Sequence, residues 1–570
     1  MIFKKDKEII IKLYKLFKPY KNKILIILIC MGISSALSIV TPLVNKLLMD
    51  EGLLGHNLSL VIKFLLINLL IIIVDQGINL YETKHQAYIS SIIPYDLNKT
   101  AFKKVLNLRL EYFNNTNIGE MMSNINLDVN NISQLCNRGT FIIIMQVFKI
   151  IGGCIGLLII SWKLTVLVVL ILPLRYITVK VFAKKREALF QSFLDALRDY
   201  SSWYGDAIGG IKEIKLWSLK VLEIGEFIKK QRNIIKVNIR MFYLDKYNEM
   251  SESITYEGIN FIIYIIGAIL VFRGSMTIGG LLAFITYSSY VIMPFSGILN
   301  LGYQYANVIP SANRFFDFLE TEDELCYLVG VEKATTEIKD NGDIIFEDVS
   351  FSHENGKKVL NRVNFKVEKG QKVAVIGTNG SGKSTIINLL LRFFQPDEGR
   401  ILYQGKNINE LSLDRYRELF SVVSQDVYLF NKSIKDNIIL KNNHKKVDIE
   451  QLCQKSGAKT FIENKPEKYE TIVGRNGTKL SGGERQKIAL ARALAKDSSI
   501  MIFDEATSNL DSQSEELFNY SILSTYKNKT VFIVTHESEV LKLVDKIILV
   551  KNGHVSIVDN YDEIMSEKLS

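Results

Sequence analysis

The sequence predicts a multidomain membrane protein in which an all-α, six-helix transmembrane domain precedes an α/β domain. Six apolar runs, each close to the about 20 residues that cross a bilayer, lie between residues 24 and 299. From Asp343 onward, short β-rich runs alternate with helical patterns. The 570 residues are 48% hydrophobic and have a mean hydropathy of +0.14, which is high for a wholly soluble protein.

Charge and cysteine content argue against several other classes of protein. The net charge of +10 could attract nucleic acid, but the lysines cluster beside hydrophobic segments, without a basic patch that has interleaved aromatic residues. We therefore expect no nucleic-acid partner. The cysteines lie far apart and lack the spacing of a disulfide framework or a zinc site; they are Cys30, Cys136, Cys154, Cys326 and Cys453.

Residues 1–23 are predicted to form a cytoplasmic amphipathic helix on the membrane surface. Eight lysines are interleaved here with Ile, Leu, Tyr and Phe at roughly helical spacing. A signal peptide is the alternative. Its charged region would be too long, and no small-residue cleavage site follows the first apolar run.

A transmembrane domain is predicted over residues 24–315, with spans near 24–48, 59–80, 139–161, 164–182, 254–272 and 277–299. Connections on one side are short and poor in lysine, whereas the other side holds most of the Lys and Arg and is therefore cytoplasmic. Both termini then lie in the cytoplasm. The inner connections, about residues 81–138 and 183–253, predict long cytoplasmic helical extensions.

A mixed, charged segment with helix breakers predicts a linker over residues 316–342 and a cytosolic domain over residues 343–570. In that domain the stretch GTNGSGKST follows a strand-like KVAVIG and precedes a helical pattern, which is the setting of a phosphate-binding P-loop. Backbone N–H groups would hold phosphate oxygens. Lys383 would contact the β- and γ-phosphates, and Ser384 would ligate Mg²⁺. The fold class is thus completed by an α/β P-loop nucleotide-binding domain.

Downstream residues distinguish this domain from a GTPase or a small-molecule kinase. SIMIFDEATS places Asp504 and Glu505 at the end of a predicted buried strand. Asp504 suits the Mg²⁺ shell and Glu505 suits a base that polarises water, although such a pair is often only a helix cap. Ser481, Gly482 and Gly483 precede a helical run and form a second candidate anion site, with an ordinary N-cap as the alternative.

The ordered set of Gly377 to Ser384, Gln425, LSGGE, Asp504-Glu505, SNLD and His536 resembles the ATP-binding-cassette superfamily. The inner-loop stretches LNLRLEYFNNTNIGEMMSNINLDVNNI and IGGIKEIKLWSLK resemble its exporter branch of six-helix half-transporters. The resemblance implies two ATP molecules sandwiched between the P-loop of one nucleotide domain and the signature, Ser481 to Glu484, of another.

The resemblance also implies roles for single residues. Gln425 would link the metal to the membrane domain, Asp511 would couple the two sites, and His536 would contact the γ-phosphate. ATP would be held by His353, Gly377, Thr378, Asn379, Gly380, Ser381, Gly382, Lys383, Ser384, Thr385, Ser481, Gly482, Gly483, Glu484 and Asp511. The catalytic set is Glu505, His536 and Gln425, and the Mg²⁺ set is Ser384, Gln425 and Asp504.

Three positions depart from the family's pattern. His353 stands where an aromatic residue usually stacks on adenine, while Phe351 on the same strand face is expected in the core. Arg475 replaces the acidic residue of the loop before the signature, so communication between the domains is expected to differ. Asn124 replaces an arginine of the first inner loop, and we draw no conclusion from it.

The resulting expectation is an ATPase that drives export of a hydrophobic or amphipathic molecule, such as a drug, a lipid or a peptide. It would act in a lipid bilayer, expected to be a bacterial plasma membrane, as a dimer with a second half-transporter. A homodimer is favoured because every catalytic position is intact, and a heterodimer stays open. The alternatives are an importer of the same architecture, an ATP-gated channel or regulator, and a soluble P-loop enzyme with an anchor, which six spans disfavour.

Two basic residues fall deep in predicted spans, Lys149 in the third and Arg175 in the fourth. Lys149 shares a helical stripe with Gly153 and Gly156, and small residues mark faces where helices pack closely. Lys149 is therefore expected to point inward. It would form an ion pair with Asp75 or Glu257; alternatively, Lys149 and Arg175 would line a cavity that favours anionic substrates.

Overall fold

The computed structural model describes residues 2–114, 116, 118–304, 308–324, 342–353, 356, 358–440, 448–505, 529–535 and 537–558. The chain divides into two compact units. The first comprises Met1–Leu106 and Asn117–Thr321, and the second comprises Asn107–Thr116 and Glu322–Ser570. We describe each unit separately.

The first unit is helical throughout its described secondary structure. Its helices are α1 (Ile2–Phe17), α2 (Lys21–Leu47), α3 (Leu58–Asn107), α5 (Ile118–Ser133), α6 (Arg138–Ile160), α7 (Trp162–Gly209), α8 (Ile211–Leu216), α9 (Lys220–Phe272), α10 (Ile278–Gln304) and α11 (Val308–Glu320). Short 3₁₀ or π turns connect α1 to α2, follow α2 and precede α6. Each predicted transmembrane run falls on one of these helices, as do most residues of the two inner connections.

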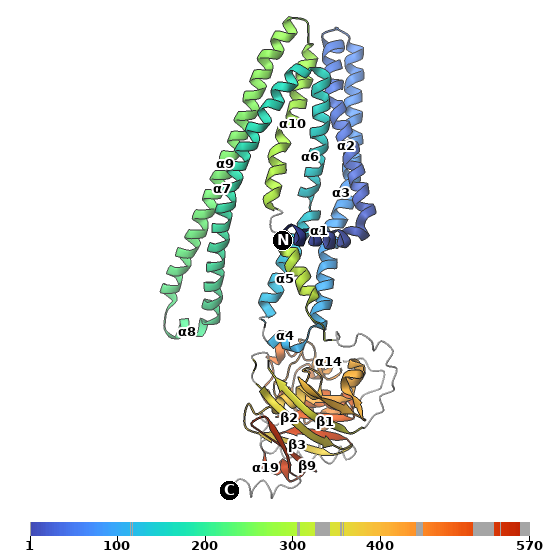
Figure 1. The fold of residues 1–570 in the computed structure, drawn as a ribbon, viewed down its shortest axis with the longest axis vertical. Helices are drawn as coiled ribbons and strands as arrows, with labels where there is room; N and C mark the ends of the chain where they lie inside the picture. Colours follow the sequence, from blue (N-terminus) through green and yellow to red (C-terminus); the bar gives the residue numbers. More distant parts are fainter. Residues whose placement is uncertain are drawn as a thin grey trace. The chain divides into compact units, whose positions relative to one another are not determined.

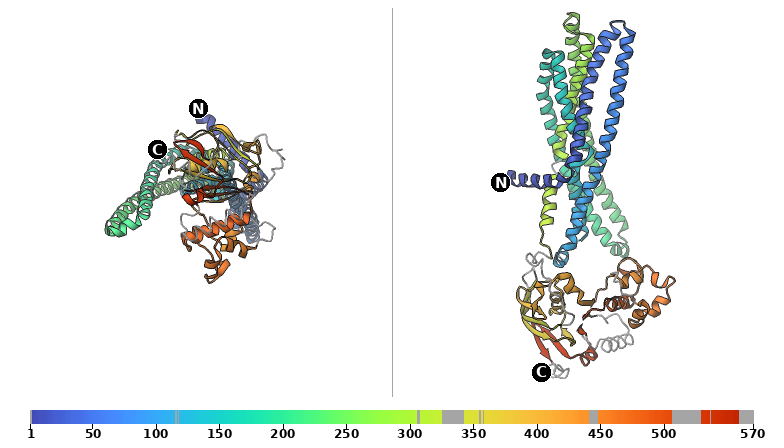
Figure 2. Two further views of the ribbon diagram at one scale, coloured as in Figure 1. Left: turned by 90° about the horizontal axis from the view of Figure 1, so that it is seen from below. Right: turned by 90° about the vertical axis from the view of Figure 1, so that its right-hand side faces the viewer.

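Two groups of helices form the first unit (Figures 1 and 2). In one group, α2, α3, α6 and α10 run along one another, whereas α7 and α9 lie side by side and are joined by α8 at one end. Leu157, Val168, Ile263, Phe284 and Tyr287 belong to a buried cluster that α6, α7, α9 and α10 share. Five described helices are long and apolar enough to cross a membrane, and the apolar part of α10 described here, Ile278–Pro294, is shorter.

The predicted amphipathic N-terminal helix is present as α1. Its apolar side chains Ile9 and Leu13 are buried, and α1 packs against α11. The Lys12 ammonium lies 5.6 Å from the centre of the Phe316 ring. The apolar face of α1 is thus covered partly by protein.

The glycine stripe of α6 packs against α10, as predicted. A Cβ atom added to Gly156 would lie 2.7 Å from the Tyr287 ring, and one added to Gly153 would lie 3.0 Å from a Val291 methyl group. Only glycine allows this close approach of the two helices. Lys149 shares this face: its ammonium lies 5.8 Å from the centre of the Tyr290 ring.

The expected ion pair of Lys149 with Asp75 or Glu257 is wrong. Asp75 instead accepts hydrogen bonds from Ser34 and Asn79, and among the described residues Lys149 has no carboxylate partner. The ring of Tyr290 attracts the ammonium without desolvating a second charge, which makes this contact less costly than a buried ion pair.

The alternative expectation, that Arg175 lines a cavity, is also wrong. Arg175 is buried between α7 and α9. The side chain is only 1% exposed, and its Nη2 lies 3.0 Å from Oε2 of Glu252. A second ion pair joins the same two helices nearer the surface, where Arg186 Nε lies 2.8 Å from Asp245 Oδ1 and both side chains are more than 40% exposed. Among the ion pairs that join α7 and α9, Arg175–Glu252 is therefore buried and Arg186–Asp245 is exposed.

The second unit contains two sheets. Its strands are β1 (Ile344–Ser352), β2 (Lys358–Val367), β3 (Lys372–Gly377), β4 (Glu398–Tyr403), β5 (Lys406–Asn407), β6 (Phe420–Val423), β7 (Ile500–Asp504), β8 (Thr530–Val534), β9 (Lys546–Lys551) and β10 (His554–Val558). Its helices are α4 (Leu110–Asn114), α12 (Lys383–Leu390), α13 (Leu413–Glu418), α14 (Ile434–Ile438), α15 (Ile449–Lys455), α16 (Lys459–Glu463), α17 (Gly482–Lys496) and α19 (Ser538–Leu541). The antiparallel sheet has the order β2-β1-β4-β5, and the larger sheet has the order β10-β9-β3-β8-β7-β6.

In the larger sheet, β9, β3, β8, β7 and β6 are parallel. Val534 of β8 pairs with Val375 of β3 on one side and with Asp504 of β7 on the other. The carboxyl ends of β3, β8 and β7 therefore meet at one edge, where ligands bind in open α/β sheets. A shared core of α12 and both sheets supports this edge, and Phe346, Leu389, Ile502 and Phe532 belong to it.

The segment Asn107–Thr116 is fixed to the second unit by polar contacts. Glu324 N–H donates to the Asn107 carbonyl at 2.7 Å, and Arg109 pairs with Glu322 at 2.8 Å. Glu324 in turn accepts two hydrogen bonds, at 2.6 and 3.2 Å, from Arg417 of α13. This part of the first inner connection thus belongs structurally to the nucleotide-domain side of the chain.

Two of the ion pairs between α7 and α9, those of Arg175 and Arg186, provide a matched test of burial. Arg175→Met leaves a carboxylate without its partner in a poorly solvated site, so we expect a loss of about 3 kcal/mol or more in the free energy of unfolding. Arg186→Met should cost roughly 0–1 kcal/mol because its pair is exposed. Thermal unfolding in lipid nanodiscs measures both, and equal effects of the two substitutions would contradict the assigned burial.

Candidate nucleotide-binding and catalytic site

The P-loop lies between β3 and α12, at the carboxyl edge of the parallel sheet. Gly377 ends the strand with φ +154°, and an added Cβ would lie 2.3 Å from the Val550 carbonyl oxygen and 2.6 Å from Ser381 Oγ. Gly382, the residue before α12, has φ +112°. A side chain is strained at both positions, so this turn requires glycine at residues 377 and 382.

The interior of the loop presents polar groups where a phosphate would bind. Lys383 is only 6% exposed, and its ammonium donates to the carbonyl oxygens of Gly377 at 2.8 Å and Thr378 at 3.3 Å. The buried Ser381 hydroxyl oxygen has no hydrogen-bond partner among the described residues. Because a buried polar group without a partner is costly, this cradle suits an anionic ligand with many acceptor oxygens.

The remaining residues of the loop differ in exposure. Thr378, Asn379 and Gly380 are exposed at its tip, and Ser384 is exposed in the first turn of α12, whereas Thr385 faces the core. The Ser384 hydroxyl oxygen is therefore accessible to a metal ion.

Asp504 and Glu505 lie on the same edge, two strands from the P-loop. Because adjacent strands are about 4.8 Å apart, β7 and β3 are separated by about 10 Å. Gln425, which follows β6, donates from Nε2 to Glu505 Oε2 at 2.8 Å. Glu505 has φ +47°, a left-handed conformation that is strained for a residue with a side chain. Strand geometry and Gln425 thus position the Glu505 carboxylate, although the backbone of this residue is strained.

The electrostatics of the edge set Asp504 apart from ordinary aspartates. Burial raises the pKa of Asp504, and the neighbouring Glu505 raises it further, while the positive charge of Lys383 partly opposes both effects. Two carboxylates that repel each other in a partly buried site favour the binding of a cation.

The residues present fit a magnesium ion bound together with a nucleotide. Mg²⁺ prefers oxygen ligands and usually takes one or two carboxylates, with water and phosphate completing its shell. The Asp504 carboxylate, the Gln425 amide oxygen and the Ser384 hydroxyl offer that chemistry. Among the described residues, no cluster of three or more His, Cys, Asp or Glu side chains forms a metal site made of protein ligands alone.

The signature segment begins α17. The helix N-cap, which the sequence analysis gave as the alternative to an anion site, is present. Ser481 Oγ accepts from the Glu484 N–H at 3.2 Å, and Glu484 Oε2 accepts from the Ser481 N–H at 2.8 Å, which is a capping box. The Ser481 hydroxyl proton can still be donated to a further acceptor, so an N-cap and an anion site are compatible.

The Glu484 carboxylate also forms an ion pair with Lys465. Burial would raise the pKa of its carboxyl group, but the Ser481 N–H and the Lys465 ammonium, 3.2 Å away, outweigh this effect and lower the pKa. Lys465 and the Ser481 N–H therefore fix the position of the last signature residue.

His353 follows β1 and is exposed. Its ring packs edge-on against Phe351 and Phe394, with ring centres 5.2 and 5.9 Å apart. Phe351 is buried and stacks on Phe394, as the sequence predicted. Arg475 and Asn124 are both exposed, and nothing in the structure explains these departures.

Of the predicted site residues, the structure brings the P-loop, Asp504, Glu505 and Gln425 to one edge. Asp511 and His536 lie outside the described residues. Sequence reasoning missed Gln486 of α17, which is 3% exposed and whose amide atoms have no partner among the described residues. Its position four residues before the buried Leu490, on the apolar face of the helix, is the signal that could have identified it.

Comparisons with known proteins agree with this architecture. The ABC transporter family matches residues 360–508, and the ABC transporter transmembrane region matches residues 24–295. An ATP-dependent lipid A-core flippase of Blochmanniella pennsylvanica is 30% identical over 474 residues, which are 82% of this chain and 80% of that protein. A protein of the same name from Alcanivorax borkumensis is 28% identical over 506 residues, 87% of this chain and 85% of that protein.

A solved structure has the same fold. A bacterial Atm1-family ABC exporter with ATP bound superposes with a TM-score of 0.80 at 21% identity, covering 96% of each chain. The matches cover both the long membrane helices and the edge where the P-loop meets Asp504 and Glu505. The chain therefore belongs to the ABC transporter family, as an exporter-type half-transporter whose ATPase domain follows its transmembrane domain.

Proposed function

We propose that this chain exports a hydrophobic or amphipathic molecule by alternating access, driven by ATP hydrolysis in a dimer of half-transporters. The observation that carries this proposal is the meeting of Lys383, Asp504 and the Gln425–Glu505 pair at one sheet edge, in a chain whose other unit contains membrane-length helices. Hydrolysis at that edge would supply the free energy, and the helices would supply the pathway.

Each residue at the edge has a proposed chemical role. Lys383 and the loop N–H groups orient the phosphates, and Ser381 offers a hydrogen bond. Glu505 accepts a proton from the attacking water, and Gln425 holds its carboxylate in place. Ser384, Asp504 and Gln425 would hold Mg²⁺, which neutralises charge on the phosphate oxygens when bound. His536 and Asp511 stay predictions from the resemblance.

A dimer is proposed because one chain has one P-loop and one signature. Ser481, Gly482 and Gly483 of one copy would cover the nucleotide held by the P-loop of the other, with the Ser481 hydroxyl donating to a phosphate. The imidazole ring of His353 would stack on adenine. A homodimer supplies two complete sites, because no catalytic position of this chain is substituted, and an unlike partner is the alternative.

An amphipathic substrate is supported by the two flippase relatives, whose names give lipid A-core as their cargo. The proposed orientation, with both termini in the cytoplasm of a bacterial cell, follows from the lysine-rich inner segments. Direction is tested by substrate uptake into vesicles of defined orientation. ATP-dependent uptake into inside-out vesicles supports export, uptake only into right-side-out vesicles supports an importer, and nucleotide-gated flux without accumulation supports a channel.

Glu505→Gln tests the proposed base. Because the amide cannot accept the proton, we expect ATP hydrolysis to fall by about 10² to 10⁴, while ATP binding persists and closed dimers accumulate. Glu539→Gln is a matched control, since Glu539 is 81% exposed and pairs with Lys542 at the surface. ATPase activity in nanodiscs and dimer formation by size exclusion measure both effects. Turnover of Glu505→Gln near that of the parent would remove Glu505 from this role.

Asp504→Asn separates stability from activity. The fold raises the pKa of Asp504 above 3.8, so its ionised form destabilises the domain, and stability falls as pH rises through the window that begins at the ordinary pKa. The amide removes this penalty. We expect a higher melting temperature without nucleotide at pH 7 and a loss of Mg²⁺-dependent ATPase activity.

Asp497→Asn serves as the control, because Asp497 is 70% exposed and pairs with Lys529 at the surface. It should change neither the melting temperature nor the activity appreciably. A lower melting temperature for Asp504→Asn would show that the carboxylate stabilises the unliganded domain, contrary to the assigned electrostatics.

A further inference from the structure

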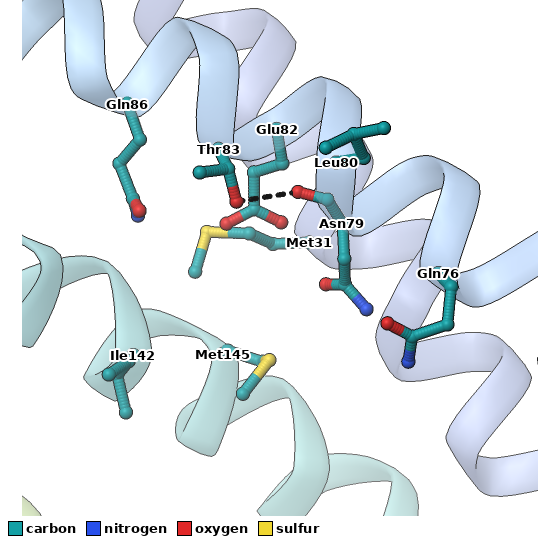
Figure 3. Close-up of a pocket in the computed structure, with 9 residues that line it drawn as sticks. All are labelled: Met31, Gln76, Asn79, Leu80, Glu82, Thr83, Gln86, Ile142 and Met145. Carbon is teal, nitrogen blue, oxygen red and sulfur yellow. Dashed lines mark hydrogen bonds between the residues drawn. The ribbon is translucent and has the colours of Figure 1, made fainter.

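A pocket in the first unit lies between α2, α3 and α6 and has a volume of about 620 Å³. Figure 3 shows that α3 contributes its polar wall, while Met31 of α2 and Met145 of α6 line the other sides. The pocket is open where Gln76, Leu80 and Thr83 are exposed.

The polar wall is a helical stripe that follows directly on the apolar run of α3. Gln76, Asn79, Thr83 and Gln86 are spaced by three or four residues, so they share one face of the helix. Gln86, at one end of the stripe, is only 7% exposed, and Glu82, one turn before it, is 9% exposed. The deep end of the pocket is therefore polar.

The carboxamides of this stripe have unused hydrogen-bonding capacity. In the described part of the chain, the side chains of Gln76 and Gln86 have no hydrogen bond to protein. Asn79 donates to Asp75 at 2.9 Å, and Thr83 donates to the Asn79 carbonyl at 2.7 Å (Figure 3). A buried carboxamide is costly unless it is hydrogen-bonded. The deep end is thus suited to a ligand that both donates and accepts.

The charges of the lining select the kind of polar ligand. None of the nine lining residues is basic, and Glu82 is acidic, so a phosphate or sulfate group would gain no ion pair. Lys149 lies one turn beyond Met145 on α6, but its ammonium is placed over the ring of Tyr290. Hydroxyl groups donate and accept in the same way as carboxamides, and they can also donate to a carboxylate.

The apolar side of the pocket suits a hydrocarbon chain. Met31 and Met145 are flexible and polarizable, so they adapt to ligands of irregular shape, and Leu80 and Ile142 extend this surface toward the opening. The pocket lies near the predicted cytoplasmic ends of the first three spans, since Met31 and Met145 each follow the start of an apolar run by about two turns. The polar stripe straddles residue 80, where the apolar run of α3 ends, so it lies at the boundary between the hydrocarbon and the headgroups of the inner leaflet.

We propose that this pocket binds the uncharged, hydroxyl-rich headgroup of an amphiphile, such as a glycolipid, before transport. The inference rests on the proposed export function and names the class of its substrate. Gln86 and Gln76 bind the hydroxyl groups, and the thioether side chains contact the first part of the hydrocarbon chain.

The test compares three probes that share one hydrocarbon chain: decyl glucoside, decyl trimethylammonium and decyl sulfate. Their binding to the full chain in nanodiscs is measured without nucleotide, below their micellar concentrations, by equilibrium dialysis. Decyl glucoside should bind most tightly. Gln86→Leu should weaken its binding by roughly 3- to 10-fold, the effect of losing one neutral hydrogen bond, and should leave the binding of decyl sulfate unchanged.

Two further variants distinguish a loss of ligand contacts from a folding defect. Gln146→Leu makes the same change on α6 at a residue that does not line the pocket, and it should not alter binding. Gln76→Leu, at the exposed end of the stripe, should weaken the binding of decyl glucoside without lowering the melting temperature. Equal binding of decyl glucoside by all four proteins, or tighter binding of decyl sulfate, would overturn the assignment.

Separate readouts distinguish this inference from the proposed function. If decyl glucoside binds through Gln86 but ATP drives no transport of any probe, the pocket stands and the export function fails. If ATP-driven export is measured but the Gln86→Leu and Gln76→Leu variants transport decyl glucoside with unchanged apparent affinity, the function stands and the substrate assignment fails.

Discussion

The parallel pairing of β3, β8 and β7 is the constraint on which the nucleotide site depends. It places Val375, Val534 and Asp504 in one row, so the P-loop and the carboxylate pair emerge from the same edge although more than a hundred residues separate them. A shift of one residue in this register would turn every side chain of a strand to its other face. The buried core beneath the edge therefore fixes the chemistry, and Gln425 completes it by holding Glu505 in a strained conformation.

The membrane unit shows how charged and polar side chains are accommodated in apolar surroundings. Arg175 is paired with Glu252, Asp75 is bound by Ser34 and Asn79, and Lys149 is placed over Tyr290. Each of these groups has a partner within the protein, which is what a poorly solvated medium favours. The carboxamides of the α3 stripe differ because they face a pocket. The paired side chains hold helices together, whereas the carboxamides that face the pocket are available to a substrate.

Much of this architecture could be predicted from sequence because its signals are local. Long apolar runs specify the membrane helices, and glycines with positive φ specify the P-loop. Packing at Gly153 and Gly156 also followed from helical spacing alone. The partners of Lys149 and Arg175 could not be predicted, because Glu252 and Tyr290 come from helices whose rotation the sequence does not define. The α3 stripe was missed for a related reason: Gln76, Asn79 and Gln86 resemble an ordinary solvated face until α2 and α6 are seen to enclose it.

The central claim, that ATP joins two chains at composite sites, can be tested by disulfide cross-linking. In a background without the native cysteines, Asn379→Cys is placed in one tagged copy and Ser481→Cys in a second, differently tagged copy; both positions are exposed. The account predicts a cross-link between the two copies that forms with ATP and Mg²⁺ and is absent when both copies carry Asn379→Cys. A protein that hydrolyses ATP but forms no such cross-link, or forms it equally without nucleotide, would contradict the account.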